Sequence, residues 1–220
     1  MSGLRTWSIW FILTCSAVIA SYLWLDRPIA LLAHEHSRPY DLFTKLTYLP
    51  GVILPLVIIA FAVIALSALN GRALSKLLTV AVLAAASLAT ATAIKDQLKF
   101  AFGRTWPETW VRNNPSFIRD GVFGFEPFHG GPGYMAFPSG HITAIFAVMS
   151  VLWICYPRFR VLYALGMAAV AVALVAANFH FLGDVIAGGF LGVSTGWLTV
   201  AIWEVGTRQV RGETPGKESQ

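Results

Sequence analysis

The sequence predicts an all-α integral membrane protein, a bundle of six transmembrane helices with an interfacial helix in the first outer loop and a long loop between spans three and four. Composition is the first observation behind this, because the 220 residues are 56% hydrophobic and only 12% charged, whereas soluble domains carry about 25% charged residues. The second is a series of apolar runs close to the ~20 residues that cross a bilayer. We expect a single domain over residues 1–220, with a flexible polar tail from about 208.

Six apolar runs are long enough to be read as spans. The first ends in Trp24-Leu25-Asp26 and lacks a small-x-small cleavage site, so we interpret it as a transmembrane helix rather than a signal peptide. The two cysteines, Cys15 and Cys155, fall within or at the end of apolar helices and are expected to be buried hydrophobic residues rather than a disulfide or metal pair. The runs are Trp7–Leu25, Pro50–Leu69, Leu77–Ile94, His141–Tyr156, Val161–Phe179 and Val185–Val205.

The first outer loop, residues 26–49, mixes charged and apolar positions. Its apolar members predict a short helix lying in the membrane interface. His34 and His36 belong to the same loop, but two histidines two positions apart point in different directions on a helix, which argues against a shared metal ion. The apolar positions are Leu31, Leu32, Leu42, Phe43 and Leu46.

The long loop between spans three and four covers residues 100–138 and is rich in glycine, proline and aromatic residues. A loop of this length in a compact protein is usually functional or disordered, and the aromatic content argues against disorder. We expect most of these rings to form an interfacial aromatic belt. The alternative for some of them is the lining of a lipid entry path.

The charge distribution predicts the orientation of the bundle. With six spans, each side of the membrane carries eight basic residues, but five of those on one side belong to the long loop. Setting that loop aside leaves eight against three, and the positive-inside rule then places both termini in the cytoplasm. The net charge of +5 comes without the basic and aromatic interleaving on a soluble face that indicates nucleic-acid binding.

Polar residues gather in three clusters, which the span prediction places on one side of the membrane. In the first, Phe137-Pro138-Ser139-Gly140-His141 precedes an apolar run, so Ser139 is expected to cap a helix that starts near His141. The free N–H groups of such a helix start form an anion site. Lys99 and Arg104 follow span three, while His180 and Asp184 lie between spans five and six.

A carboxylate four residues after a histidine shares its face on a helix. We therefore expect Asp184 to bind one ring nitrogen of His180 and leave the other as a nucleophile. A helix-end hydrogen bond is the structural alternative for a single pair of this kind. The two further clusters on the same side favour the functional reading.

These motifs resemble the type 2 phosphatidic acid phosphatase superfamily, in its membrane-embedded branch. That family carries Lys-x6-Arg-Pro, Pro-Ser-Gly-His and Ser-Arg-x5-His-x3-Asp on a six-helix bundle. The matches here are Lys99 with Pro107, Pro138-Ser139-Gly140-His141 in full, and His180 with Asp184. The resemblance covers residues 50–205.

Two arginines of the family pattern are absent. Trp106 stands where the first motif has arginine, and Ala173 and Leu174 stand where the third has Ser-Arg. Arginine binds phosphate through a bidentate, charge-assisted contact. Either other basic residues replace these two arginines, or catalysis is weak. The sequence leaves both open. The candidate replacements are Arg104, Arg112 and Arg119.

The resemblance implies roles for the clustered residues. His180 would attack phosphorus, oriented by Asp184, and His141 would protonate the leaving oxygen and then activate water. The resemblance implies neither a metal ion nor a cofactor. The phosphoryl oxygens would be held by Lys99, Arg104, Ser139 and the N–H groups of Gly140 and His141.

By this resemblance the chain is expected to be a membrane phosphatase that hydrolyses a lipid phosphate or diphosphate through a phosphohistidine. It would sit in a bacterial-type cytoplasmic membrane with the site facing the periplasm or exterior. Undecaprenyl diphosphate, phosphatidylglycerol phosphate, phosphatidic acid and lipid A phosphates all fit, and membrane lipids are the other expected partners. A lipid-to-lipid phosphotransferase and a weakly or non-catalytic lipid-phosphate binder are the alternatives, and the oligomeric state stays open.

Overall fold

The computed structural model describes residues 2–37, 41–47, 75–110 and 112–210, together with Ile59 and Val63. Within these ranges the regular structure is helical and contains no β-strand, which confirms the all-α prediction. The second expected span, Pro50–Leu69, lies outside the described residues except for those two positions. The count of six spans therefore stays a prediction.

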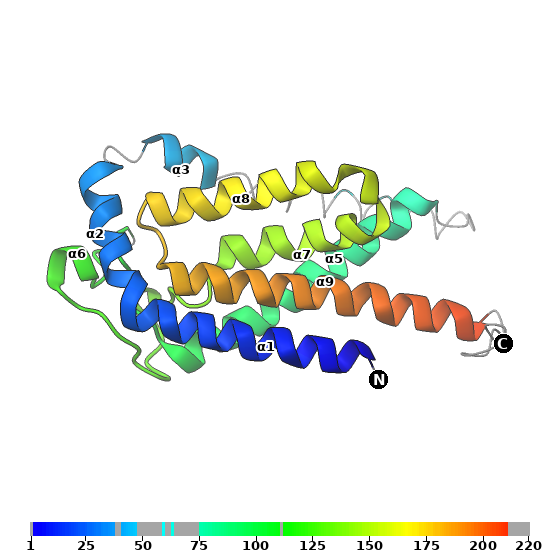
Figure 1. Cartoon of the computed structure of the whole chain (residues 1–220), viewed down its shortest axis with the longest axis horizontal. Helices are drawn as coiled ribbons and strands as arrows, with labels where there is room; N and C mark the ends of the chain where they lie inside the picture. The colour runs from blue at the N-terminus through cyan, green and yellow to red at the C-terminus, as the bar shows by residue number, and fades with distance from the viewer. Residues whose placement is uncertain are drawn as a thin grey trace.

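The chain begins with a long helical segment, which is blue in Figure 1. It consists of α1 (Ser2–Ala20), a π-helical turn (Ser21–Leu25) and α2 (Asp26–His36). The stretch Gly3–His36 is long and apolar enough to cross a membrane, as predicted for the first span. The sequence indicated that the first helix ends before Asp26, but the helical segment continues through α2. The first outer loop therefore contains α2 and then a second short helix, α3 (Asp41–Thr47).

Four further helices complete the described bundle: α5 (Lys76–Phe102), α7 (Gly140–Cys155), α8 (Arg160–Ala176) and α9 (Leu182–Val210). Three segments among them also have the length and hydropathy of a membrane span, namely Lys76–Phe102, Pro157–Ala176 and Leu182–Gln209. The helix α7 is apolar but shorter. The predicted fifth span ran three residues too far, because the chain turns after Ala176 and Asn178 adopts a positive φ of 52°.

Glycines on α9 bring it against α7 at the centre of the bundle. A Cβ atom at Gly192 would lie 2.6 Å from the Cβ of Phe146, and one at Gly196 would lie 1.9 Å from Ser150 Oγ. Side chains larger than hydrogen are therefore excluded from this contact, which is the small-residue packing typical of membrane bundles. Both cysteines are free and lie in helices, but each is only half-buried and not buried as expected.

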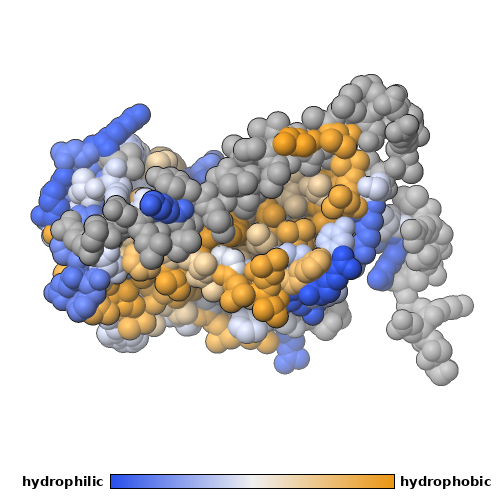
Figure 2. Space-filling model, turned by 90° about the horizontal axis from the view of Figure 1, so that it is seen from above, coloured by the Kyte–Doolittle hydropathy of each residue, from blue (hydrophilic) through white to orange (hydrophobic). Residues whose placement is uncertain are grey.

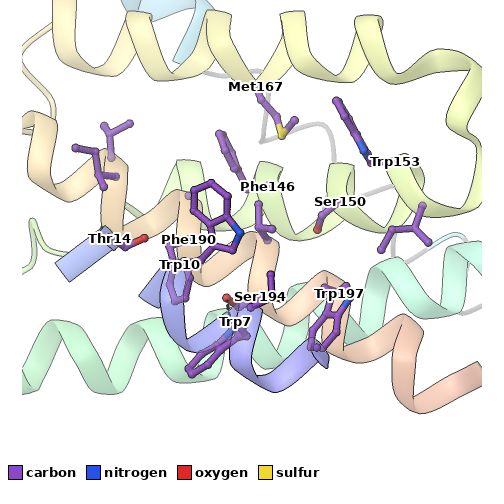
Figure 3. Close-up of a pocket in the computed structure, with 17 residues that line it drawn as sticks. Trp7, Trp10, Thr14, Phe146, Ser150, Trp153, Met167, Phe190, Ser194 and Trp197 are labelled. Carbon is purple, nitrogen blue, oxygen red and sulfur yellow. Dashed lines mark hydrogen bonds between the residues drawn. The ribbon is translucent and has the colours of Figure 1, made fainter. Parts of the chain in front are cut away.

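The outer surface matches a membrane environment. Figure 2 shows apolar residues over the middle of the visible face and hydrophilic residues towards its ends. A groove with a volume of about 880 Å³ opens between α1, α7, α8 and α9. Its labelled side chains in Figure 3 are mostly aromatic, and the indole nitrogen of Trp7 donates a hydrogen bond to Ser194 Oγ across it at 3.0 Å.

The long loop covers one end of the bundle. It contains the single helical turns α6 (Phe117–Asp120) and Pro132–Tyr134. In Figure 1 it lies at the left, where α5 ends and α7 and α9 begin, whereas α1 begins and α9 ends at the right. The sequence placed the loop start at residue 100, but α5 continues to Phe102 before Gly103 ends the helix in the left-handed conformation.

Candidate functional site

The three predicted polar clusters meet at the loop-covered end of the bundle. Lys99 lies in the last turn of α5, Ser139 is the N-cap of α7, and Asp184 lies in the first turn of α9. The backbone N–H of Ser139 donates to the carbonyl oxygen of Asp184 at 3.0 Å. This contact joins the second and third motifs directly, although 45 positions separate them in the sequence.

The start of α7 presents an unpaired hydroxyl. The Ser139 carbonyl oxygen accepts hydrogen bonds from the backbone N–H and the hydroxyl of Thr143. Its own side-chain Oγ is fully buried and has no hydrogen-bond partner. The predicted cap therefore acts through backbone geometry and not through a side-chain hydrogen bond. Burying a hydroxyl without a hydrogen-bond partner costs free energy. An anion bound at this helix start would accept a hydrogen bond from it.

His180 and Asp184 form the predicted pair, but by a different local structure. His180 precedes α9 and lies in the turn after α8, so the two residues do not share a helix face. His180 Nδ1 lies 3.5 Å from Asp184 Oδ2, and Asp184 Oδ2 accepts the backbone N–H of Phe181 at 2.9 Å. The Nδ1 atom has no hydrogen-bond partner, and a slight rotation of the ring would close this contact.

Burial controls the protonation of His180. Its side chain is 3% exposed, and removal from water lowers the pKa of the imidazole below its ordinary value of 6.5, with Asp184 acting in the opposite direction. The indole of Trp106, which replaces the family arginine, lies beside the imidazole with 5.2 Å between ring centroids. His180 is thus held neutral, the state in which a ring nitrogen is a nucleophile.

Lys99 and His141 lie on the other side of the nucleophile candidate. The Lys99 ammonium donates to the carbonyl oxygen of Met135 and lies 5.7 Å from the Trp106 ring centroid. A Cβ atom at Gly140 would lie 3.9 Å from Lys99 Cε, so the lysine passes over the start of α7. His141 is exposed and interacts electrostatically with both His180 and Lys99.

Arg104 is not where a phosphate clamp would be. Its side chain is fully buried, and its two terminal nitrogens bind Asp184 Oδ1, at 2.7 Å, and Asp26 Oδ2. Only Nε is left without a partner. The rings of Phe125 and Phe181 lie 4.8 and 4.6 Å from its central carbon. In this conformation both terminal nitrogens of the guanidinium bind carboxylates, so they cannot form a bidentate contact with a phosphoryl group.

The other candidate replacements for the missing arginines are exposed at the surface. Arg112 is exposed. Arg119 is held at the surface by Asp120, with 2.8 Å between Nε and Oδ1, and by Asn113. Leu174, where the third motif has arginine, is fully buried in the core with Ile142. Lys99 lies at the start of α7, and Lys95 lies there too, because a Cβ atom at Gly140 would be 3.8 Å from Lys95 Nζ.

Asp26 is a buried charged residue beside the site that the sequence interpretation did not include. It had been read as the polar end of the first span, yet it is 1% exposed and bound to Arg104. The signal was present, since an ionisable residue at the end of a membrane span is a candidate site residue. His34, in the same helix, pairs with Glu108 at 3.1 Å. The described residues contain no cluster of three or more metal-ligating side chains.

Comparisons with known proteins find relatives of this chain. Among curated proteins, the lipid A 1-phosphatases of Rhizobium etli and Rhizobium johnstonii are 32% and 31% identical over 107 and 110 residues. These regions cover 49% and 50% of this chain but only 42% of each relative, so the chain matches less than half of the relatives' length.

A solved structure shows the same fold. The crystal structure of a transmembrane PAP2-type phosphatidylglycerolphosphate phosphatase from Bacillus subtilis matches with a TM-score of 0.62. The match covers 93% of this chain and 98% of the other, at 18% sequence identity. The likeness therefore concerns the fold.

The family follows from the extent of a sequence match together with the site. The PAP2 superfamily model matches residues 78–208, which is more than half of the chain and includes all three motifs. Within this range lie the residues that meet around His180. The chain therefore belongs to the PAP2 superfamily.

Proposed function

We propose that this protein is an integral membrane phosphatase that hydrolyses a lipid phosphate or diphosphate through a phosphohistidine at His180. One observation carries the proposal: a buried imidazole, a lysine and an unpaired buried serine hydroxyl converge at a helix N-terminus. These are the groups needed to attack phosphorus and to hold phosphoryl oxygens. The membrane-spanning helices around the site support a substrate that stays in the bilayer.

The chemistry proceeds in two displacements. A ring nitrogen of His180 attacks phosphorus, and the bond from phosphorus to the lipid oxygen breaks. His141 gives its proton to that oxygen. Water then loses a proton to His141 and attacks phosphorus, so that the P–N bond breaks and inorganic phosphate leaves. Lys99, Ser139 Oγ and the N–H groups of Gly140 and His141 hold the phosphoryl oxygens during both steps, whereas Asp184 holds His180 in place.

The substrate belongs to the class of lipid phosphates. Lipid A 1-phosphate and phosphatidylglycerol phosphate are favoured by the names of similar proteins, while phosphatidic acid and undecaprenyl diphosphate fit the same chemistry. The test is phosphate release by purified protein in detergent from a panel of these four lipids, with EDTA present. Release that depends on His180 supports the proposal. Transfer of labelled phosphate to a second lipid instead of water would identify a phosphotransferase, and binding without either reaction would identify a carrier.

The site is proposed to face the outside of the cytoplasmic membrane, with both termini inside. Support comes from the charge count and from the position of the site at the opposite end of the bundle from the start of α1 and the end of α9 (Figure 1). After replacement of both native cysteines, Gly124→Cys should react with an impermeant thiol reagent on intact cells, because Gly124 has open space around it. Gln209→Cys should not react. The reverse pattern would place the site in the cytoplasm.

A further inference from the structure

A buried chain of charges runs behind His180. Asp26, Arg104 and Asp184 are 1%, 0% and 0% exposed. One terminal nitrogen of Arg104 binds Asp184 Oδ1 at 2.7 Å, and the other binds Asp26 Oδ2. The second oxygen of Asp184 faces His180 Nδ1. The carboxylate that orients the imidazole is thus itself oriented by a guanidinium, whose other end is fixed by a carboxylate from the first helix.

Asp26 also binds the backbone beside Asp184. Its Oδ1 atom accepts the N–H of Gly183 at 3.0 Å, and the hydroxyl of Ser21 at 2.6 Å. A Cβ atom at Gly183 would lie 3.3 Å from both Arg104 Nη1 and Asp26 Oδ2, which explains why glycine precedes Asp184. Both carboxylate oxygens of Asp26 are therefore used, and it reaches Asp184 by two routes, one through Arg104 and one through the peptide.

The π-helical turn Ser21–Leu25 places Asp26 in this position. The extra residue per turn brings Ser21 and Asp26, five positions apart, within hydrogen-bond distance of each other. Wider turns of this kind often occur at functional sites. Aromatic rings of Tyr22, Phe125 and Phe181 surround the guanidinium, and in such surroundings the attraction between the charges is strong.

The geometry points to Asp26 as a positioning residue for the reaction at His180, acting with Arg104 to hold Asp184 in the orientation that binds the imidazole. The inference rests on the proposed function, because it assigns a role within the same site. Asp26 contacts neither the substrate nor His180. Its removal should therefore lower kcat without changing KM, and should loosen the preference of His180 for one ring tautomer.

The test compares Asp26→Asn with the matched control Glu35→Gln, which changes an exposed carboxylate of the same helix α2. The substrate is the lipid phosphate that the wild-type protein hydrolyses fastest among the four of the panel. Loss of a group that orients another side chain of a site typically lowers activity about 10–100-fold. We expect that loss in kcat for Asp26→Asn, with KM within about twofold, and no change for Glu35→Gln. Asp26→Glu, which keeps the charge, should recover part of kcat.

A purely structural role for Asp26 predicts a different result. It would lower the fraction of active protein, counted as acid-labile phosphoenzyme, while kcat for each active molecule stayed at the wild-type value. That outcome would overturn the inference, as would a kcat for Asp26→Asn within twofold of wild type. The double variant Asp26→Asn/Arg104→Gln adds a second criterion. Arg104→Gln leaves two buried carboxylates without their cation, so the added Asp26→Asn should restore activity at least about tenfold.

A spectroscopic measurement separates this inference from the proposed function. Nitrogen-15 spectra of histidine-labelled protein, with the His180 signals assigned by His180→Ala, report the tautomer without any turnover. We expect one tautomer in the wild type and a mixture in Asp26→Asn. Unchanged His180 signals would overturn the positioning role even if the protein is a phosphatase. Wild-type protein that releases no phosphate from any lipid of the panel would instead overturn the proposed function, whatever the spectra show.

Discussion

The two sides of His180 are built in opposite ways. On the inner side, Asp184, Arg104 and Asp26 form an almost completely paired chain in which only Arg104 Nε lacks a partner. On the outer side lie Ser139 Oγ, which is buried and unpaired, the helix start of α7, and an exposed His141. The inner side is complete without a ligand, whereas the outer side retains donors for one.

This difference separates two tasks that charged residues perform in such a site. Paired, buried charges fix the position of the imidazole before substrate arrives, so that little reorganisation is needed during the reaction. Unpaired buried donors stabilise a phosphoryl anion strongly, because its oxygens accept the hydrogen bonds that these donors otherwise lack. A basic residue near the motif can serve either task, and only its contacts decide which. Substitutions on the two sides should therefore differ in the kinetic constant that they change.

The largest effect is expected at the residue that both sides share. His180→Ala should reduce turnover by about 10⁴-fold or more, because loss of a nucleophile removes the covalent route. The acid-labile phosphoenzyme should disappear with it. His129→Ala is the matched control, since His129 is exposed and bonded to Gly130. Normal phosphate release by His180→Ala would remove the basis of the comparison and leave the carrier alternative ahead.

Lys99→Met tests the outer side. This lysine passes over the start of α7 and lies beside Trp106, so its loss should lower kcat/KM by roughly 10²–10³-fold, with weaker inhibition by inorganic phosphate. Lys76→Met, in the first turn of the same helix α5, should change neither constant. If Lys99→Met retains wild-type phosphate inhibition, Lys99 does not hold the phosphoryl group.

Arg104→Lys tests the inner side. Lysine keeps the charge but cannot bind Asp26 and Asp184 at the same time with a fork, so kcat should fall about 10–100-fold. Inhibition by inorganic phosphate should stay as in the wild type, because the buried guanidinium contacts no substrate. Weaker phosphate inhibition would show that Arg104 belongs to the outer side, as its position in the sequence indicated.

The pH profile of the wild type reports the burial of His180. The imidazole must be neutral to attack, and burial lowers its pKa below the ordinary 6.5. As the pH falls, the neutral form of His180 is lost only when the pH passes this lowered pKa. We therefore expect the acid limb of kcat/KM that depends on His180 to be centred below pH 6.5, the pH at which an ordinary histidine has lost about half of its neutral form. An acid limb centred at or above pH 6.5 would contradict this.

The smallest effect is expected outside both sides. Arg119 is exposed and tied to Asp120 and Asn113, so Arg119→Gln should leave kcat and KM within about twofold of wild type. This variant measures how much kcat and KM change when an arginine of the loop, outside both sides of the site, is removed. A loss as large as that of Lys99→Met would mean that the loop moves Arg119 into the site during the reaction.

The sequence predicted the outer side of the site better than the inner side. Lys99, the Ser139 helix start and His180 were identified because each belongs to a local motif whose geometry depends on neighbours in the chain. The contacts of Arg104 with Asp184 and Asp26 were not predicted, because the direction of its side chain depends on Gly103. That residue ends α5 with a positive φ of 59°, and a Cβ there would lie 1.8 Å from the Glu126 carbonyl oxygen. Proximity to Lys99 in the sequence carried no information about this turn.

Asp26 was missed for a similar reason. Its contacts with Arg104 and Gly183 join positions 78 and 157 residues apart, and no periodicity or motif marks them. Long apolar runs predicted the helices α5, α8 and α9, but not where they end. The third run stops at Ile94, whereas α5 continues to Phe102, and the fifth run continues to Phe179, whereas α8 ends at Ala176.

The continuous helix that joins α1 to Asp26 makes the site sensitive to the number of residues in that helix, and not only to their identity. Each residue of an α-helix turns its direction by about 100°. Deleting one residue from α1, before the π-helical turn, would rotate everything before the deletion by that angle relative to Asp26. Either α1 would lose its packing against α9 or Asp26 would leave Arg104. Hydropathy alone treats a change of length in this apolar helix as neutral. The contacts of Asp26 with Arg104 and Gly183, far along the chain, therefore exclude such a change.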